Sequence, residues 1–194
     1  MALRLFVAMA VPAAIKAALG RVRDELQSEL PHARISWTRP ESMHLTLRFL
    51  GAVSPDDVLP LGHALTEATR NFGVLELNCD GLGCFPGLRS PRILWAGVHD
   101  TADRLPQLSR QITVPTSRFT QEPAEARFTG HITLGRIRQK LALAEARKIS
   151  GYLERSAQRG FGLWTATAVE LMQSELNPGG SQYTVIEQFS LAGS

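Results

Sequence analysis

The chain of 194 residues has few cysteines and no long apolar segment, and both absences narrow its class. Cys79 and Cys84 are too few for a disulfide framework or a four-ligand zinc site. We expect them to be free thiols in a reducing cytoplasm. No apolar segment approaches the roughly 18 residues of a membrane span, and the apolar start at residues 5–11 is too short for a signal peptide. The sequence therefore predicts a cytoplasmic protein that does not associate with membranes.

Motifs of several hydrolase classes are also missing. No Gly-x-Ser-x-Gly motif is present, which argues against a serine hydrolase. No Asp, Glu or Cys stands at metal-ligand spacing from His44 or His131, so we expect no metal and no cofactor. Lysine is scarce, with 3 residues against 18 arginines, and the net charge is +3. That charge suits an anionic substrate but is far from a histone-like balance.

The remaining composition is that of a globular protein, with 44% hydrophobic and 20% charged residues. Strand and helix patterns alternate along the chain. Apolar residues at helical spacing follow Pro12 and stop at Pro31, and a later helix must stop before Pro115. The other expectations are a strand that ends at Gly51, a loop at residues 81–87, one strand at residues 163–176, a turn at residues 177–180 and a closing strand at residues 182–191.

The most informative feature is a short motif that occurs twice. His44 and Thr46 belong to one His-x-Thr-Leu segment, His131 and Thr133 belong to another, and 87 positions separate the histidines. Side chains alternate between the two faces of a strand, so each histidine shares a face with its threonine. A single motif of this kind is usually structural, whereas two of them can place two histidines across one cleft.

The order of elements repeats as well. Arg4–Ala8 resembles Arg92–Ala96 at an offset of 88, close to the offset between the histidines. Such near-constant offsets predict a duplicated unit, with approximate repeats at residues 3–83 and 91–177. Two similar units usually pack about a pseudo-twofold axis, which would bring the two histidines opposite each other. We therefore expect one domain with two lobes.

Two histidines can divide acid–base catalysis between them, because the pKa of an unperturbed imidazole is about 6.5. In-line displacement at phosphorus needs one group to activate water and another to protonate the departing oxygen. The hydroxyls of Thr46 and Thr133 can donate to the non-bridging oxygens. A metal-free site of this kind suits a strained cyclic phosphodiester, such as a nucleoside 2′,3′-cyclic phosphate. His32, His63 and His99 have no such context, and we expect them at the surface.

These motifs and their flanks resemble the bacterial and archaeal RNA 2′,3′-cyclic phosphodiesterases of the 2H phosphoesterase superfamily, once called 2′-5′ RNA ligases. The resemblance covers almost the whole chain. It is carried by Arg4–Ala8, Trp37–Gly51, Gly81–Pro86, Pro91–Gly97, His131–Arg136 and Ser174–Tyr183. One departure is Gly130, where relatives usually have proline, and we expect it to loosen the backbone before the second histidine.

The resemblance implies a bilobal, duplicated α+β fold with two antiparallel-rich sheets that line a central cleft and with helices outside. It implies hydrolysis of RNA or nucleoside 2′,3′-cyclic phosphate ends to a 2′-phosphate without metal. His131 would be the general base toward water and His44 the general acid toward the ribose 3′-oxygen. Thr46 and Thr133 would bind the phosphate. The alternatives are 2′-5′ ligation of RNA halves by the same histidines, or a module that binds RNA ends without catalysis. We expect a monomer.

The resemblance also assigns the nucleobase to Phe49 and Arg136, five positions after each histidine. An aromatic ring and a planar cation can stack on a base without reading its identity. Strict alternation would turn both residues away from the histidines. A strand end or bulge near Leu50-Gly51 and at Gly135 must therefore re-aim them, or else Phe49 is a core aromatic.

Overall fold

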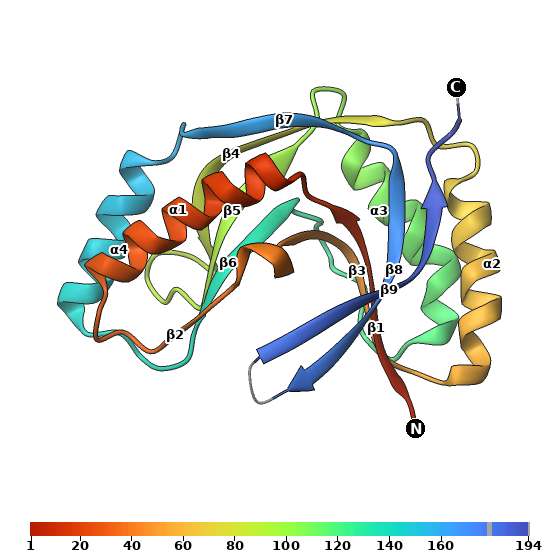
Figure 1. The fold of residues 1–194 in the computed structure, drawn as a ribbon, viewed down its shortest axis with the longest axis horizontal. Coiled ribbons are helices and arrows are strands. Elements are labelled where there is room, and N and C mark those ends of the chain that lie inside the picture. Colours follow the sequence, from red (N-terminus) through yellow and green to blue (C-terminus); the bar gives the residue numbers. More distant parts are fainter. Residues whose placement is uncertain (178–179, 194) are drawn as a thin grey trace.

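The computed structural model describes residues 1–177 and 180–193, which form four α-helices and nine strands (Figure 1). The strands are β1 (Leu3–Ala10), β2 (Ile35–Trp37), β3 (His44–Val53), β4 (Leu75–Phe85), β5 (Ile93–His99), β6 (His131–Ile137), β7 (Gly160–Ala166), β8 (Ala168–Asn177) and β9 (Gly180–Ser190). The helices are α1 (Ala13–Glu29), α2 (Val58–Thr69), α3 (Arg104–Thr116) and α4 (Leu143–Arg155). Three short 3₁₀ helices lie between them: η1 (Pro40–Ser42), η2 (Pro55–Asp57) and η3 (Ser117–Phe119).

The strands form one curved antiparallel sheet in the order β7-β4-β5-β6-β3-β1-β8-β9, and β2 pairs with β6. The α+β class predicted from the sequence is confirmed, and the two expected sheets are joined where β3 meets β6. Leu45 and Ile132 form the junction pair. We call β3, β1, β8 and β9 the His44 half of the sheet, and β6, β5, β4, β7 and β2 the His131 half.

Corresponding strands of the two proposed repeats occupy mirrored places around the junction. β6 and β3 lie at the centre, β5 and β1 flank them, and β4 and β8 follow. A duplication of residues 3–83 and 91–177 would give this order. The duplication itself stays a prediction.

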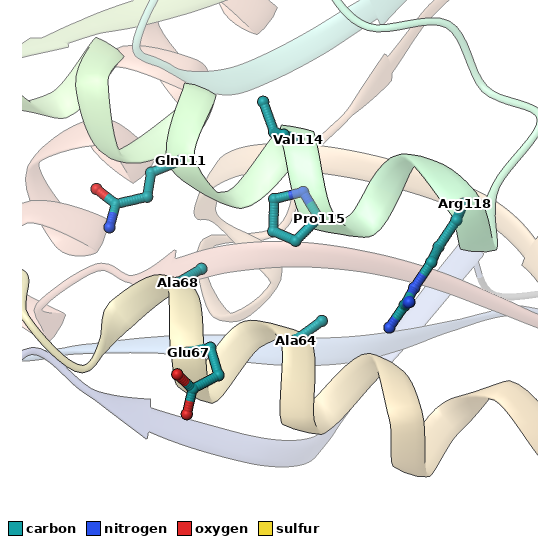
Figure 2. Close-up of a pocket in the computed structure, with 7 residues that line it drawn as sticks. All are labelled: Ala64, Glu67, Ala68, Gln111, Val114, Pro115 and Arg118. Atoms are coloured by element: carbon teal, nitrogen blue, oxygen red, sulfur yellow. The ribbon is translucent and has the colours of Figure 1, made fainter.

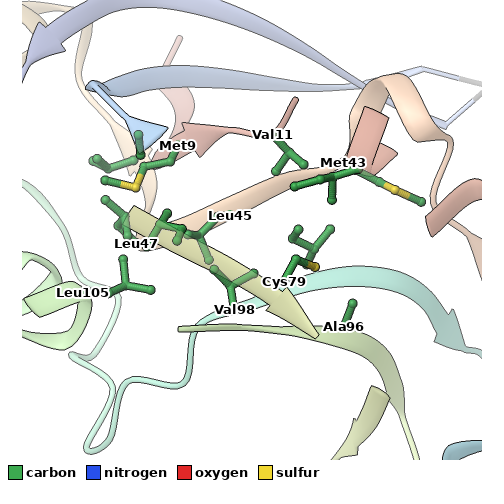
Figure 3. Packing of buried hydrophobic residues seen from close by; sticks show 14 of the residues in the cluster. Met9, Val11, Met43, Leu45, Leu47, Cys79, Ala96, Val98 and Leu105 are labelled. Atoms are coloured by element: carbon green, nitrogen blue, oxygen red, sulfur yellow. The ribbon is translucent and has the colours of Figure 1, made fainter. Parts of the chain in front are cut away.

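One face of the sheet carries the hydrophobic core. Leu45 and Leu47 are almost completely buried there, together with Met9 and Val98 (Figure 3). α1 and α4 contact the His131 half, whereas α2 and α3 pack on each other and against the His44 half. Within the described part of the chain, no helix has the length and apolar character needed to cross a membrane.

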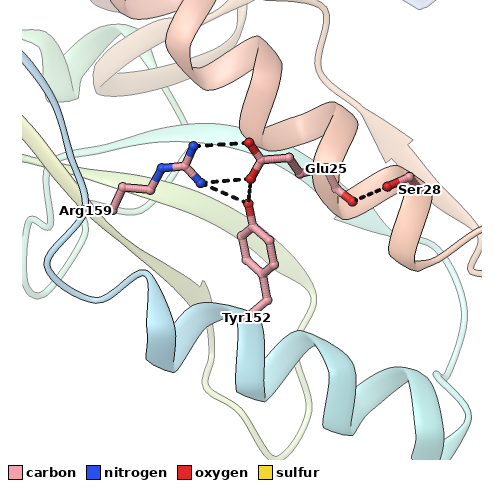
Figure 4. A network of polar contacts seen from close by, with 4 residues as sticks. All are labelled: Glu25, Ser28, Tyr152 and Arg159. Atoms are coloured by element: carbon pink, nitrogen blue, oxygen red, sulfur yellow. Dashed lines mark hydrogen bonds and ion pairs between the residues drawn. The ribbon is translucent and has the colours of Figure 1, made fainter.

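A polar cluster joins α1 to the end of α4 over the His131 half (Figure 4). Arg159 donates to the carboxylate of Glu25 through Nη1 (2.8 Å) and Nη2 (3.2 Å), and the Tyr152 hydroxyl donates to the same carboxylate. The hydrogen bonds from Arg159 and Tyr152 lower the pKa of Glu25 to about 2. The carboxylate therefore remains ionised and binds both partners at neutral pH.

Two strand ends predicted at glycines are wrong, because these glycines allow the strands to continue. Gly51 has a φ of +63°, and β3 continues past it. The loop expected at residues 81–87 is largely strand, since β4 extends to Phe85 with Gly81 as an extra, bulged residue. Gly83 lies under the ring of Trp95, where a Cβ atom would approach the ring to 2.3 Å.

Two further predictions are wrong. α3 continues through Pro115 to Thr116. A proline in the last turn removes only one backbone donor, and the Thr116 hydroxyl donates to the Ile112 carbonyl of the preceding turn. The single strand expected at residues 163–176 is divided at Thr167 into β7, which pairs with β4, and β8, which pairs with β1. The turn expected at residues 177–180 includes residues 178 and 179, which lie outside the described residues.

Candidate active site

The two His-x-Thr motifs meet where the two halves of the sheet join. Counting outward from the junction pair in antiparallel register puts His44 beside Thr133 and His131 beside Thr46. The junction pair is buried, so these four residues share the opposite face of the sheet, and all four are partly exposed. We call this face the histidine face. The sheet thus brings together the catalytic candidates of both motifs.

A bulge three residues after each histidine changes which side chains follow on this face. The extra residue is Leu47 in β3 and Leu134 in β6. An extra residue shifts the alternation by one, so Phe49 and Arg136 come to the histidine face. Phe49 is 44% exposed, and the interpretation of Phe49 as a core aromatic is wrong.

The backbone carbonyls of the two bulged residues accept hydrogen bonds from groups outside the paired strands. The Leu47 carbonyl accepts a hydrogen bond from Ser109 Oγ (3.0 Å), and the Leu134 carbonyl accepts one from the Thr38 amide (2.9 Å). The bulge expected near Leu50 also exists, but it follows Phe49 and does not turn that ring. The bulge that turns Phe49 is therefore not marked by a glycine, whereas the bulge at Leu134 directly precedes Gly135, where one was expected.

Each histidine ring is fixed by the carbonyl two residues before it. His44 Nδ1 lies 2.9 Å from the Ser42 carbonyl oxygen, and His131 Nδ1 lies 2.8 Å from that of Thr129. A carbonyl can only accept, so Nδ1 carries the proton in both rings. Nε2 of each neutral ring is then left with a lone pair. Both histidines thus present the same nitrogen as a base when neutral and as an acid when protonated.

The rings around the two histidines differ. His44 lies 4.8 Å from the Phe6 ring and 5.0 Å, edge-on, from the Tyr183 ring, between ring centroids. The second histidine lies edge-on to Phe85 at 5.0 Å, with Trp95 at 6.4 Å. Sequence reasoning gave these four aromatics no role, although each belongs to a segment that carries the family resemblance.

Burial lowers the pKa of both histidines, and the charges nearby act on them unequally. The pKa of His44 falls to about 4, and the charges of Lys16 and Arg136 contribute to the lowering. Burial also lowers the pKa of His131, but the carboxylate of Glu125 acts in the opposite direction. In each ring the hydrogen bond to the backbone carbonyl also favours the protonated form. Both imidazoles are therefore mainly neutral at pH 7 in the free protein.

Several hydrogen-bond donors on the histidine face are free to bind a ligand. Among the described residues, the Thr46 and Thr133 hydroxyls and the Arg136 guanidinium have no hydrogen-bonding or acidic partner. The two hydroxyls lie on the face that carries both histidines and are suited to donate to the oxygens of a phosphate, and the guanidinium adds a free positive charge for an anionic substrate.

The segment before the second histidine is held from two sides. Arg48 is buried, and its Nη1 and Nη2 donate to the carbonyls of Pro123 (2.6 Å) and Glu122 (2.7 Å). The Gly130 carbonyl accepts from the Val98 amide at 2.9 Å. A Cβ atom at Gly130 would lie 2.3 Å from the Val98 oxygen, so this glycine packs directly on β5. The loosening expected at Gly130 is absent, and the burial of Arg48 had no signal in the sequence.

Features elsewhere do not add to this site. His32, His63 and His99 are exposed, as expected. No group of three or more His, Cys, Asp or Glu residues within 1–177 and 180–193 is arranged to hold a metal ion. A groove of about 490 Å³ separates α2 from α3 and is lined by residues such as Ala64 and Gln111 (Figure 2). Its lining residues all belong to these helices and to η3, away from the histidine face.

Comparisons with known proteins agree with the geometry. A family model described as LigT like Phosphoesterase matches residues 9–95. The RNA 2′,3′-cyclic phosphodiesterase of Thermus thermophilus is 31% identical, and the match covers 98% of this chain and 91% of that protein. The chain belongs to the LigT-like phosphoesterase family.

Other LigT-like phosphoesterases support the same assignment. The RNA 2′,3′-cyclic phosphodiesterase of Aquifex aeolicus is 26% identical over 98% of both chains. The crystal structure of TT0787 of Thermus thermophilus matches with a TM-score of 0.78 and 27% identity, over 98% of this chain and 99% of that one. The family resemblance inferred from the sequence and the α+β fold are therefore both confirmed.

Proposed function

We propose that this chain hydrolyses 2′,3′-cyclic phosphate ends of RNA, or nucleoside 2′,3′-cyclic phosphates, to 2′-phosphates without a metal. The chain is a phosphoesterase of the LigT-like family, and the two relatives described above carry the name of this activity. The strongest support is the matched pair of rings: His44 and His131 expose the same nitrogen on one face and hold Nδ1 in the same way. Free hydroxyls beside them fit the phosphate oxygens.

In the proposed reaction the two histidines act on opposite sides of the phosphorus. His131 Nε2 takes a proton from water, and the water oxygen forms a bond to phosphorus. The bond from phosphorus to the ribose 3′-oxygen breaks, and His44 Nε2 gives that oxygen its proton. The 2′ ester bond remains, so the product is a 2′-phosphate. The negative charge of the bound phosphate raises the pKa of the ring that must enter protonated.

The remaining residues would bind the substrate. Thr46 and Thr133 would donate to the non-bridging oxygens, where negative charge is held during displacement. Phe49 and Arg136 would stack on the two sides of the nucleobase. Their exposure on the histidine face, brought about by the two bulges, supports this role.

Product identification tests the proposal directly. Incubation with 2′,3′-cyclic AMP in the presence of EDTA is expected to give 2′-AMP, resolved from 3′-AMP by chromatography. Release of 3′-AMP would contradict the direction of ring opening. Loss of activity with EDTA, restored by added metal, would contradict metal independence.

A further inference from the structure

Arg136 of the candidate site and two further arginines continue the histidine face. Arg136 lies near the end of β6 and Arg138 directly follows that strand, so their side chains, two positions apart in extended chain, lie on the same face about 6.8 Å apart. Ser36 of β2 pairs with Arg136, and the Arg138 amide donates to the Arg34 carbonyl at 2.8 Å. Arg34, which directly precedes β2, therefore lies beside Arg138. All three arginines are exposed, and we call them the arginine row.

The positive charges of the arginine row are not neutralised by the part of the chain that the structure describes. Within the described residues none of the three arginines has an acidic partner, whereas Arg23 and Arg159 each pair with a carboxylate. Like charges side by side on neighbouring strands destabilise a sheet. Arg138 is also oriented, since its Nε donates to Ser36 Oγ at 2.8 Å, and no described residue forms a hydrogen bond or ion pair with its terminal nitrogens. An oriented, unpaired guanidinium is suited to bind phosphate through two parallel hydrogen bonds.

The surfaces on the other sides of the site are unsuited to a phosphate backbone. Residues 168–190, which include β8 and β9, contain three glutamates and no lysine or arginine. At the opposite end of β6, a pocket of about 430 Å³ next to Thr129 is lined by Asp80, Asp100 and Asp103 against a single arginine, Arg127. Charge complementarity therefore directs an RNA strand from the histidines toward β2 and the end of β6 (Figure 1).

We propose that Arg34 and Arg138 bind two successive backbone phosphates of an RNA strand, on the 5′ side of its 2′,3′-cyclic phosphate end. This inference rests on the proposed function and specifies its substrate as an oligonucleotide end in preference to a free nucleotide. Arg34 and Arg138 lie opposite each other in antiparallel register, so their Cβ atoms are about 4.5–5.5 Å apart. Two long side chains that start this close together can reach two neighbouring phosphates of an extended single strand. The arginines read no sequence, because phosphate contacts position a nucleic acid without identifying its bases.

The test measures binding of product, so that it does not depend on turnover. Fluorescence anisotropy would follow a labelled ten-nucleotide RNA that ends in a 2′-phosphate, with 2′-AMP as competitor, at several salt concentrations. We expect the double variant Arg34→Ala/Arg138→Ala to bind the RNA about 10- to 100-fold more weakly at low salt. Its loss for 2′-AMP should be much smaller. The slope of log affinity against log salt should decrease by about 1.4, since each phosphate contact contributes about 0.7 for a single strand.

A matched control removes the same charge elsewhere. Arg110 on α3 and Arg147 on α4 are exposed and lie outside the histidine face, and Arg110→Ala/Arg147→Ala is expected to bind the RNA like the wild type. Equal losses in the two double variants, equal losses for RNA and 2′-AMP, or no loss at all would overturn the inference. Failure of the proposed function would appear separately, as absence of 2′,3′-cyclic AMP hydrolysis by the wild-type protein.

Discussion

Both halves of the sheet direct a histidine Nδ1 to the carbonyl two residues earlier, place two aromatic rings beside that histidine and bulge three residues after it. They differ after the bulge, where the His44 half carries the exposed ring of Phe49. The His131 half continues into arginines. Acid–base chemistry requires the same ring orientation on both sides, whereas the surroundings are free to specialise. We infer that Phe49 gives the His44 half an aromatic side for the nucleobase. The arginines give the His131 half a cationic side, where Arg136 stacks on the nucleobase and the arginines beyond it bind phosphates.

The largest expected effect comes from removing the catalytic histidine that each half contributes. His44→Ala and His131→Ala are each expected to lower kcat on 2′,3′-cyclic AMP by about 10²- to 10⁴-fold, the usual contribution of one general acid or base. The exposed His63 on α2 provides the control, and His63→Ala should retain the wild-type rate. Wild-type turnover by either active-site variant would rule out the paired mechanism.

An activated substrate distinguishes the two histidines. A p-nitrophenyl phosphodiester has a leaving group that departs without a proton, so the general acid becomes unnecessary. With His44 as the acid, His44→Ala should lose far less activity on this ester than on the cyclic nucleotide, and His131→Ala should lose similar amounts on both. The reverse pattern would exchange the two roles.

Phe49 and Arg136 differ between the halves, and removing either side chain should weaken substrate binding more than it slows the chemical step. Phe49→Ala and Arg136→Ala are each expected to raise KM by about 5- to 150-fold, since stacking on one base contributes about 1–3 kcal/mol. The Arg136 effect should shrink at high salt because charge is screened, and the Phe49 effect should not. Val114→Ala, which shortens an exposed apolar side chain on α3, is the control. Equal salt dependence of both variants would contradict an aromatic side and a cationic side.

The sequence predicted the shared features of the halves better than their differences. Alternation in His44-x-Thr46 and its counterpart placed the histidines and threonines on one face, because a strand of period two leaves no other choice. The bulge expected at Gly135 occurs one residue earlier, at Leu134, but the bulge that turns Phe49 occurs at Leu47 and not near Leu50-Gly51. The carbonyls of Leu47 and Leu134 are satisfied by groups distant in sequence. Tertiary hydrogen bonds of this kind cannot be read from local pattern.

The positions of several charged residues also could not be predicted from the local sequence pattern. Arg48 follows the bulged residue and is buried with its guanidinium on two carbonyls, although strict alternation would place it with His44. Arg34 and Arg138 are far apart in the chain and are brought together only by the pairing of β2 with β6. Helix positions were predicted well where apolar spacing was regular, as in α1, and poorly at Pro115, where packing keeps α3 helical.

A smaller effect is expected from Glu125, whose negative charge acts on the pKa of His131. The Glu125 carboxylate raises the pKa of His131, so Glu125→Gln should lower it. A general base must be neutral, and its pKa sets the acid limb of the kcat/KM profile. With His131 as the base, the acid limb should move to lower pH; with His131 as the acid, the alkaline limb should move instead. Glu29→Gln serves as control, and an unchanged profile in Glu125→Gln would show that the carboxylate does not act on the site.

The smallest effect concerns the helices behind the two halves. Glu25 is held by Arg159 and Tyr152 over the His131 half, and its pKa falls from 4.5 to about 2 on folding. A lowered pKa stabilises the folded state above pH 4.5, and this contribution disappears as the pH falls toward 2.

The measurement is the free energy of unfolding of Glu25→Gln and wild type across this pH range. The carboxylate is 44% exposed, so solvent screening limits the difference at pH 7 to about 1 kcal/mol or less. Most of the difference should be lost by pH 2, where about half of the folded molecules have a protonated Glu25. Glu67→Gln removes the exposed Glu67–Arg70 pair of α2 over the His44 half and should change stability less, with little pH dependence. If the two variants show the same pH dependence, the cluster stabilises the His131 half no more than an ordinary surface pair does.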